Sequence, residues 1–579
     1  MRICHQANFC ILIFFSLLSF NIKQTVFTIM QTKVLKIHPK DNVAVALTVL
    51  YMGEEISNNA FSTVQIQENI PAKHKFALTD LNEGDEVIMY GVLVGKAMSY
   101  IPAGGLLSIN NIKHASGSFQ LKERHTNWHK PDVAAFQTKT FNGFYRADGS
   151  VGTRNYWLVI PLVFCENKNV SVLQEAFMKA LGYAPKESPY EAMVQRMIRE
   201  YESGNKEYDL LFADEDEFVL ENKKIFPNVD GIKFLTHTLG CGGTRDDARA
   251  LCGLLAGYIT HSNVAGATVL SLGCQNAQVA TLKEEIEKRD ADFLKPMILL
   301  EQQKIGNESK LLSEAVKRTF EGLAQANELE RKPAPLSKLC IGLECGGSDG
   351  FSGISANPAI GYTSDILIAL GGSVILSEFP ELCGVEQELS DRCVDENLAE
   401  EFMHLMTTYN KRAMEVGSGF YANPSPGNIK DGLITDAIKS AGAAKKGGTS
   451  PVADVLDYPG KVSKPGLNLL CTPGSDVEST TAEVGAGANI VLFTTGLGTP
   501  TGNPVTPVLK LSTNTALYNK MNDIIDIDTG PIIEGNETIE KAGERILDYI
   551  IDVANGDVKA KAEAGLHDDF IPWKRGISL

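Results

Sequence analysis

Several signatures of common protein classes are missing from this 579-residue sequence. It contains no C-x-x-C pair, which argues against a zinc ribbon and against a ferredoxin-type cluster sequence. It has no G-x-x-x-x-G-K-[ST] loop, and Gly496-Leu497-Gly498 lacks the third glycine of a dinucleotide-binding turn. The sequence therefore gives little support to nucleotide binding.

A concentration of positive charge is missing as well. The formal net charge is −17, from 54 Lys and Arg against 71 Asp and Glu. This balance argues against nucleic acid or a membrane as partners. An anionic small molecule would have to be held by local Arg, Lys, metal ions or backbone N–H groups. The length predicts two to four domains, and 44% hydrophobic residues are typical of a globular protein.

Cysteines are too few for a disulfide framework. There are eleven, an odd number, and several follow predicted strands. This usage favours reduced thiols and a cytoplasmic location. In residues 1–29 the apolar run Cys10–Phe20 follows Arg2, but it is short for a membrane span and no small-x-small cleavage site follows. We interpret 1–29 as an over-extended N-terminus, with a signal-like segment as the alternative.

Hydrophobic periodicity divides the rest of the chain into a small β domain and a large α/β body. Short apolar runs between turn residues predict an all-β domain first, and a polar linker follows it. Strand and helix patterns then alternate, which predicts βα units with parallel sheets in two halves. A charged insertion at 200–224 should be exposed, and the Pro-rich 332–335 should be a break. The predicted boundaries are 30–116, 117–140, 141–331 and 336–579.

The stretch 339–353, L-C-I-G-L-E-C-G-G-S-D-G-F-S-G, is the centre of the functional prediction. Its apolar run delivers Glu344 and Cys345 to the end of a predicted strand. A Gly-rich turn with Ser348 and Asp349 follows. Ligands of open parallel sheets bind beyond the carboxyl ends of the strands. A glycine-rich turn with a buried cysteine is the alternative.

Four predicted strands end at a cysteine next to Gly, Glu or Asn: Cys165, Cys241, Cys274 and Cys345. Parallel strands in one sheet, or in two facing sheets, can bring such ends to one crevice. Thiols there suit iron or zinc, as a single ion or as an iron–sulfur cluster. A structural role and a nucleophilic cysteine are the alternatives. His237 is a further candidate ligand.

Charged residues near glycine-rich turns are candidates for binding an anion. Arg146, Arg154 and Lys430 could donate charge-assisted hydrogen bonds to a carboxylate. In the first domain, the turn at 38–42 and the basic segment at 71–75 carry His, Asp and Lys side chains. A plain surface turn is the alternative for both.

These motifs, in this order, resemble the altronate/galactarate dehydratase family from about Met30 to Leu579. They are I-H-P-K-D-N-V-A-V-A-L, K-H-K-F-A-L-T-D, G-x-x-R-A-D-G-S-V-G-T-R-N, H-T-x-G-C, L-G-C-x-N, G-L-E-C-G-G-S-D-G-x-S-G-I-x-A-N-P, E-x-P-E, N-P-S-P-G-N and T-G-x-G-T-P. The resemblance implies a mobile SAF (β-clip) domain and an α/β catalytic body. It also implies a hydro-lyase of hexuronate (galacturonate) catabolism that uses Fe²⁺ or Mn²⁺ and converts D-altronate to 2-dehydro-3-deoxy-D-gluconate.

Roles follow for individual residues under this resemblance. The catalytic candidates are His74 and Lys75, supported by His38 and Asp41, together with Glu344. The substrate-binding candidates are Arg146, Arg154, Asn155, Gly346, Gly347, Ser348, Asp349, Asn428 and Lys430. The metal candidates are Cys165, Cys241, Cys274, Cys345 and His237. The expected partner is a sugar acid, and homo-oligomerisation is left open.

Two segments depart from the family pattern. Ser108-Ile109-Asn110-Asn111 stands where the family often has His-x-His-Asn. After Asn428 the chain reads I-K-D-G-L-I-T-D in place of K-x-G-G-[IL]-T-T. Galactarate, another aldarate or elimination of another group from a 2-hydroxy acid therefore remain alternatives, as does a non-catalytic sugar-acid-binding protein.

Overall fold

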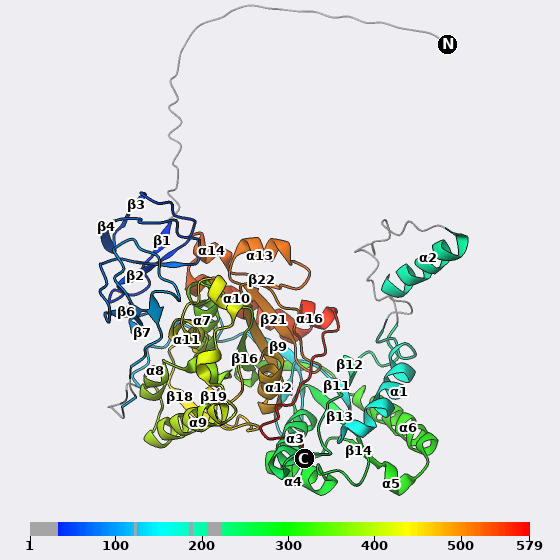
Figure 1. The fold of residues 1–579 in the computed structure, drawn as a ribbon. Helices are drawn as coiled ribbons and strands as arrows, with labels where there is room; N and C mark the ends of the chain where they lie inside the picture. Colours follow the sequence, from blue (N-terminus) through cyan, green and yellow to red (C-terminus); the bar gives the residue numbers. More distant parts are fainter. Residues whose placement is uncertain (1–32, 118, 121–123, 125, 185–188, 205–222) are drawn as a thin grey trace, which may run out of the picture.

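A small β domain, a middle α/β domain and a larger α/β domain make up the molecule (Figure 1). The computed structural model describes residues 33–117, 119–120, 124, 126–184, 189–204 and 223–579. The interpreted N-terminal extension and most of the 200–224 insertion lie outside these residues. Within them, no helix combines the length and apolar character needed to cross a bilayer.

The first domain consists of short antiparallel strands, as predicted. They form the sheets β1-β2-β5, β3-β4 and β6-β7-β8. Their inward side chains, such as Val43 and Val45, are fully buried. The strands are β1 (Val34–Leu35), β2 (Val43–Ala46), β3 (Glu55–Asn58), β4 (Phe61–Gln65), β5 (Lys75–Ala77), β6 (Glu86–Met89), β7 (Val92–Ala97) and β8 (Ile112–Lys113).

The middle domain has a four-stranded parallel sheet in the order β12-β11-β13-β14. Its central strands are buried along their whole length, because helices cover both faces. The strands are β11 (Tyr156–Pro161), β12 (Gly231–Phe234), β13 (Val264–Ser271) and β14 (Met297–Glu301). The helices are α1 (Asn167–Met178), α2 (Pro189–Ser203), α3 (Arg245–Thr260), α4 (Val279–Arg289), α5 (Gln302–Ile305) and α6 (Glu308–Ala326).

The third domain has a seven-stranded parallel sheet in the order β18-β19-β17-β16-β20-β21-β22. The strands are β16 (Cys340–Cys345), β17 (Ser373–Leu376), β18 (Val452–Leu456), β19 (Gly466–Leu470), β20 (Ile490–Thr495), β21 (Val508–Ser512) and β22 (Ile527–Asp528). The helices are α7 (Ala356–Ala369), α8 (Glu386–Asp391), α9 (Glu396–Glu415), α10 (Pro426–Lys430), α11 (Asp436–Ala443), α12 (Asp476–Ala486), α13 (Thr515–Lys520), α14 (Gly530–Ile533), α15 (Ile539–Asn555) and α16 (Lys561–Ala564). This α/β body with parallel sheets is the predicted fold class.

The Pro-rich segment predicted as a break is a strand. β15 (Lys332–Pro335) pairs antiparallel with β9 (Thr140–Tyr145), which also pairs with β10 (Val151–Gly152). Proline is tolerated because β15 lies at the edge of this small sheet. The segment therefore connects the two α/β domains through a sheet instead of a loose tether.

Candidate active site

Two neighbouring strands of the seven-stranded sheet end at the candidate site. β16 ends at Cys345, and β17 leads into Glu378 and a short 3₁₀ helix that carries Glu381. Because the strands are parallel, their carboxyl ends bring these side chains together. The Cys345 Sγ lies 3.2 Å from Glu381 Oε2 and 3.6 Å from Glu378 Oε2.

Two buried lysines pair with these carboxylates. Lys446 Nζ lies 2.6 Å from Glu378 Oε2, and Lys439 Nζ, on α11, lies 2.5 Å from Glu381 Oε1. Burial opposes ionisation of Glu381, but the ammonium groups of Lys439 and Lys446 outweigh it and lower the pKa of this carboxyl. The site therefore keeps an ionised carboxylate away from bulk water.

Within the described part of the chain, several other carboxylate oxygens of this cluster accept no hydrogen bond from an N–H or hydroxyl group. They are both oxygens of Glu344, Oε1 of Glu378 and Oε2 of Glu483. Burial, together with the charges of Glu378 and Glu483, raises the pKa of Glu344 well above its ordinary value. Burial also raises the pKa of Glu483 to about 8. Buried carboxylates without partners are costly, and a cation or a proton would relieve that cost.

Cys345, Glu378 and Glu381 fit a metal ion. Their donor atoms all lie within 4.8 Å of one another, and all three side chains are buried. Carboxylates suit Mn²⁺, and thiolate draws the preference toward softer ions such as iron. The unpartnered Glu378 Oε1 offers a further donor. Without a metal the thiol is protonated, because burial and the charges of Glu378 and Glu381 raise the pKa of Cys345.

The first domain covers this cluster. Lys73 Nζ lies 2.9 Å from Asp349 Oδ2 and 3.3 Å from Asp431 Oδ1. Lys75 Nζ donates to the Gly432 carbonyl at 2.6 Å. The space left over the cluster is about 10 Å³, and Tyr90 of the first domain lines it beside residues of the third. The structure thus shows the first domain docked and the site closed.

Backbone strain gathers at the same place. Lys73, Tyr90 and Glu378 have φ values of 74°, 58° and 61°. They are three of the four described non-glycine residues in the left-handed region. Such conformations cost about 1–3 kcal/mol each and tend to mark functional sites.

Burial shifts the pKa values of His74 and Lys75, the two acid–base candidates of the first domain. Lys75 is fully buried, and this burial lowers its pKa to about 7, although Asp349 opposes the shift. His74 is half-buried, and burial lowers its pKa as well. A general base works best when its pKa lies near the operating pH. Both residues remain candidates on the docked domain.

His38 and Asp41 shape a neighbouring turn. Asp41 accepts hydrogen bonds from the His38 and Gly91 backbone N–H groups at 2.9 and 2.8 Å. Gly91 follows Tyr90, which lines the closed site. The contacts of Asp41 shape this turn and do not reach the carboxylate cluster. The supporting role of both residues stays a prediction.

The predicted glycine-rich loop closes around the site. A Cβ on Gly346 would lie 2.1 Å from Asp476 Oδ2, and Gly347 has φ 61°. Ser348 lines the cavity, and its carbonyl accepts a hydrogen bond from Asn428 Nδ2 at 2.8 Å. The structure therefore brings these residues together at the site. Asp349 forms the ion pair with Lys73 that docks the first domain. Lys430 is exposed at the end of α10.

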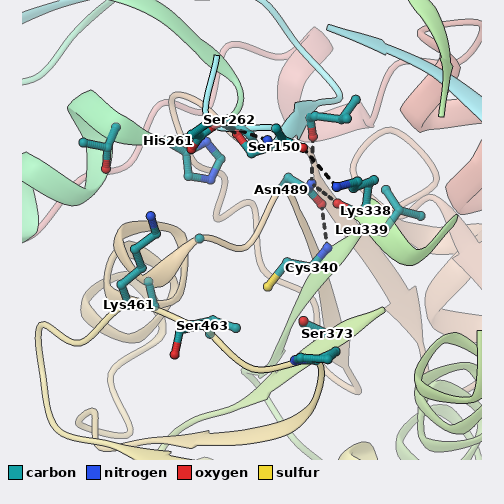
Figure 2. A pocket seen from close by; sticks show the side chains of 18 of the residues that line it. Ser150, His261, Ser262, Lys338, Leu339, Cys340, Ser373, Lys461, Ser463 and Asn489 are labelled. Carbon is teal, nitrogen blue, oxygen red and sulfur yellow. Dashed lines mark hydrogen bonds between the residues drawn. The ribbon is translucent and has the colours of Figure 1, made fainter. Parts of the chain in front are cut away.

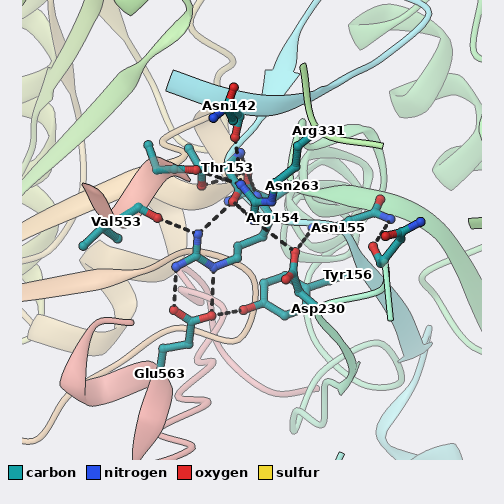
Figure 3. Close-up of polar contacts among 12 residues, drawn as sticks. Asn142, Thr153, Arg154, Asn155, Tyr156, Asp230, Asn263, Arg331, Val553 and Glu563 are labelled. Atoms are coloured by element: carbon teal, nitrogen blue, oxygen red, sulfur yellow. Dashed lines mark hydrogen bonds and ion pairs between the residues drawn. The ribbon is translucent and has the colours of Figure 1, made fainter. Parts of the chain in front are cut away.

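Three predicted substrate-binding residues, Arg146, Arg154 and Asn155, hydrogen-bond to other parts of the protein. Figure 3 shows Arg154 and Asn155 among these contacts. Arg154 Nε and Nη2 each lie 2.8 Å from a Glu563 oxygen, and Nη1 donates to the Val553 carbonyl. Arg146 donates to the Asn155 side chain and to the Ser262 carbonyl. These contacts are those of structural residues, because buried arginines must find partners within the protein. Arg154 joins the middle domain to the third, whereas Arg146 and Asn155 bond within the middle domain.

The predicted single metal site is divided between two sheets. Cys345 belongs to the third domain, whereas Cys165, Cys241 and Cys274 follow strands of the middle domain. His237 is unavailable as a ligand, contrary to the prediction. Its Nε2 lies 2.8 Å from the Pro161 carbonyl, and its Nδ1 accepts from Leu239 N at 3.1 Å.

A cavity of about 510 Å³ lies at the opposite edge of the large sheet, near Cys340 and Ser373 at the amino ends of β16 and β17 (Figure 2). Its cationic side chains bind carbonyl groups. Lys338 Nζ donates to Gly149 O at 3.0 Å, and Lys461 Nζ donates to Arg289 O at 2.8 Å. None of the predicted catalytic residues lines this cavity.

Sequence reasoning missed most of the charged cluster. Glu378 and Glu381 stand in the quoted E-x-P-E motif, which was a signal without an assigned role. Lys439 and Lys446 lie in helical segments without a motif, and their partners are 58 and 68 positions away. A search for charged residues in segments predicted to be buried would have found them.

Three family models match consecutive parts of the chain. An altronate/galactarate dehydratase SAF domain matches residues 32–115. The second domain of D-galactarate dehydratase/altronate hydrolase matches 143–327, and the C-terminal domain of D-galactarate/altronate dehydratase matches 336–578. The cluster at Cys345 lies in the last of these.

Curated relatives are similar over nearly the whole chain. Altronate dehydratase of Escherichia coli (strain K12) is 35% identical over 553 residues, 94% of this chain and 99% of the relative. Altronate dehydratase of Bacillus subtilis (strain 168) is 34% identical, again over 94% and 99%. Galactarate dehydratase (L-threo-forming) of E. coli is 30% identical over 93% and 95%. The chain therefore belongs to the altronate/galactarate dehydratase family of hydro-lyases.

Proposed function

We propose that this protein converts D-altronate to 2-dehydro-3-deoxy-D-gluconate and water in the cytoplasm, as a step of hexuronate catabolism. The family supports dehydration of a sugar acid, and the altronate relatives are more similar than the galactarate relative. The observation that carries the proposal is the buried cluster of Cys345, Glu378 and Glu381 beneath the docked first domain. The described cysteines are all free, which supports a reducing compartment.

Dehydration of a 2,3-dihydroxy acid needs a base at C2 and an acid at the leaving C3 hydroxyl. Lys75 is the candidate base, because a pKa of about 7 leaves a sizeable neutral fraction at neutral pH. His74 is the candidate acid for the departing hydroxyl. Lys439 and Lys446 hold Glu381 and Glu378 in fixed positions.

Cys345, Glu378 and Glu381 would hold Fe²⁺ or Mn²⁺. When bound there, the ion would supply Lewis-acid stabilisation of the negative charge that develops on the substrate. The buried oxygens of Glu344, which have no partner, would orient a substrate hydroxyl or hold a proton.

Substrate entry requires the first domain to move. The closed site has a volume of about 10 Å³, which is about the space of one water molecule. The docked domain is held by the polar contacts of Lys73 and Lys75 and by apolar packing, since Tyr90 and Val94 belong to the same buried core as residues of the third domain. Opening and closing of this domain would admit the sugar acid and then exclude water, as lids do.

The test is product formation from each sugar acid. Purified protein is incubated without oxygen with altronate or galactarate, in the presence of Fe²⁺, Mn²⁺ or a chelator, and the 2-keto-3-deoxy product is quantified. We expect turnover of altronate that the chelator abolishes and the metal restores. Galactarate turnover alone would replace the substrate assignment, and no turnover of either acid would contradict the proposal.

A further inference from the structure

Three cysteines that the proposed reaction does not use lie at the carboxyl edge of the middle sheet. Cys165 follows β11, Cys241 follows β12 and Cys274 follows β13. β11 is the hydrogen-bonded neighbour of both other strands. The three thiols therefore come from adjacent strand ends, where parallel sheets build their ligand sites.

Hydrogen bonds hold the three cysteine loops against one another. The Phe164 N–H donates to the Leu239 carbonyl at 3.0 Å, which joins the loops of Cys165 and Cys241. The Ala277 N–H donates to the Gly240 carbonyl at 3.0 Å, which joins the loops of Cys241 and Cys274.

These are also the exposed cysteines of the described chain. Nine cysteines are described, and the other six are buried or half-buried. Free cysteine behaves as a small apolar residue and is among the most buried residue types. Packing therefore does not explain three exposed thiols at one edge.

Glycines next to two of these thiols let the cysteine loops pack closely against neighbouring segments. Gly240, next to Cys241, has φ +99°, and a Cβ there would lie 2.4 Å from the Leu162 carbonyl. Gly273, next to Cys274, has φ +124°, and a Cβ there would lie 2.7 Å from Gln303 Oε1. The two hydrogen bonds of the His237 ring fix the segment that leads to Cys241. Glycine is needed at both places because only glycine tolerates this backbone and this spacing.

One thiol already accepts a hydrogen bond. Gln303 Nε2 donates to Cys274 Sγ at 3.2 Å. Hydrogen bonds to ligand sulfurs orient them and tune the metal group they hold. Gln303 follows β14, so all four strands of the sheet contribute to this edge.

The spacing of the thiols favours a cluster over a single ion. Two sulfurs on one ion at bonds of about 2.3 Å cannot be farther apart than roughly 4.6 Å. Among the described residues, the groups whose donor atoms all lie within 4.8 Å do not include these three cysteines. An iron–sulfur cluster places each cysteine on a different iron, and so accepts a wider spacing.

We propose that Cys165, Cys241 and Cys274 bind an iron–sulfur cluster at the edge of the middle domain. The absence of a C-x-x-C pair is no obstacle, because each ligand comes from a different strand end. Three thiolates leave one iron of a four-iron cluster without a cysteine ligand. This site is separate from the cluster of Cys345, Glu378 and Glu381, and its existence does not depend on the proposed reaction.

The test is the iron and sulfide content of the full chain, purified without oxygen and reconstituted with Fe²⁺ and sulfide. We expect about four irons and about four sulfides per chain with broad visible absorption. Cys241→Ser and Cys274→Ser should each lose most of the sulfide and the absorption. Cys340→Ser, at the cavity of Figure 2, is the matched control and should retain both. Circular dichroism shows that each variant is folded.

Three results would overturn the proposal. The first is iron without acid-labile sulfide, and the second is a single zinc ion bound by these thiols. The third is unchanged sulfide content in folded Cys165→Ser, Cys241→Ser and Cys274→Ser proteins. Because the readout is bound iron and sulfide, the outcome stands whether or not altronate is the substrate.

Discussion

Two groups of charged residues lie largely away from solvent in this protein, and they differ in how fully they are hydrogen-bonded. In the first, Arg154 is buried and Glu563 is partly buried. Arg154 and Glu563 form an interdomain clasp in which the guanidinium makes a two-point contact and also binds two carbonyls. Tyr156 donates a further hydrogen bond to Glu563. In the cluster at Cys345, by contrast, oxygens of Glu344, Glu378 and Glu483 accept no hydrogen bond from an N–H or hydroxyl group of the described residues.

This difference in hydrogen bonding indicates a structural role for Arg154 and Glu563 and a functional role for the cluster at Cys345. A buried pair that is fully hydrogen-bonded holds its surroundings in place, although it adds little net stability. A buried carboxylate without a partner has an energetic cost that folding alone does not explain. Strained backbone at Lys73, Tyr90 and Glu378 accompanies the second group. Unsatisfied polar atoms together with local strain therefore single out the candidate active site better than buried charge does.

Removal of the candidate base should give the largest change, a loss of kcat. Lys75→Met keeps the shape of the buried side chain and removes the amine, so kcat should fall roughly 10²–10⁴-fold. In the wild-type protein kcat/KM should rise with pH through about 7 as Lys75 loses its proton. Steady-state assays over pH measure both quantities. Lys40→Met, on an exposed turn of the same domain, is the control, and equal activity of the two variants would remove Lys75 from the mechanism.

Breaking the clasp should affect stability instead. Arg154→Met leaves the Glu563 carboxylate without its charged partner and should lower the free energy of unfolding by about 3–5 kcal/mol. Denaturant titration measures this loss. The double variant Arg154→Met/Glu563→Leu should recover part of it, since no lone charge remains. Wild-type stability in the single variant would show that the clasp is dispensable.

His74→Ala tests whether the docked domain contributes chemistry or only covers the site. We expect kcat to fall roughly 10²-fold with normal folding, because His74 is half-buried beside the docking contacts. Circular dichroism and the same assay measure both properties. Full activity of the folded variant would contradict a chemical role for this residue.

The pH dependence of stability should have opposite signs for the two groups. The pKa of Glu563 is lowered to about 2. Its stabilising contribution to the free energy of unfolding is therefore present above the unfolded pKa of about 4.3 and is lost as pH falls toward 2. The pKa of Glu483 is raised to about 8, so its contribution is present at low pH and is lost as pH rises through 8. Glu563→Gln should flatten the stability profile between about pH 2 and 4.3, and Glu483→Gln should flatten it between about pH 4.3 and 8. Chemical denaturation at several pH values measures these slopes, and equal slopes in both variants would contradict the assignment.

The sequence predicted the fold from local patterns. Apolar runs ending at Gly and Cys marked strand ends, and the alternation of strand and helix patterns implied parallel sheets. The segment of β15 was predicted as a break between domains because two of its four residues are prolines. Only the pairing with β9 explains why an edge strand accepts them.

The site was only partly predictable for a similar reason. Cys345 and the glycine-rich loop stand in one continuous motif. Arg154 and Glu563, however, are 409 positions apart, and no local pattern indicates that they meet. An arginine beside glycines was therefore interpreted as anion binding, whereas its partner is a distant carboxylate. The division of the four cysteines between two sheets depends likewise on tertiary structure.

The central claim is that altronate is dehydrated at the cluster of Cys345, Glu378 and Glu381. The most direct measurement is the turnover of altronate by Glu381→Gln, made on protein whose free energy of unfolding is also determined. The substitution keeps the shape of the side chain and removes the charge that Lys439 neutralises. We predict a loss of kcat of roughly 10²-fold or more in a folded protein. Unchanged turnover by folded Glu381→Gln protein would contradict the account.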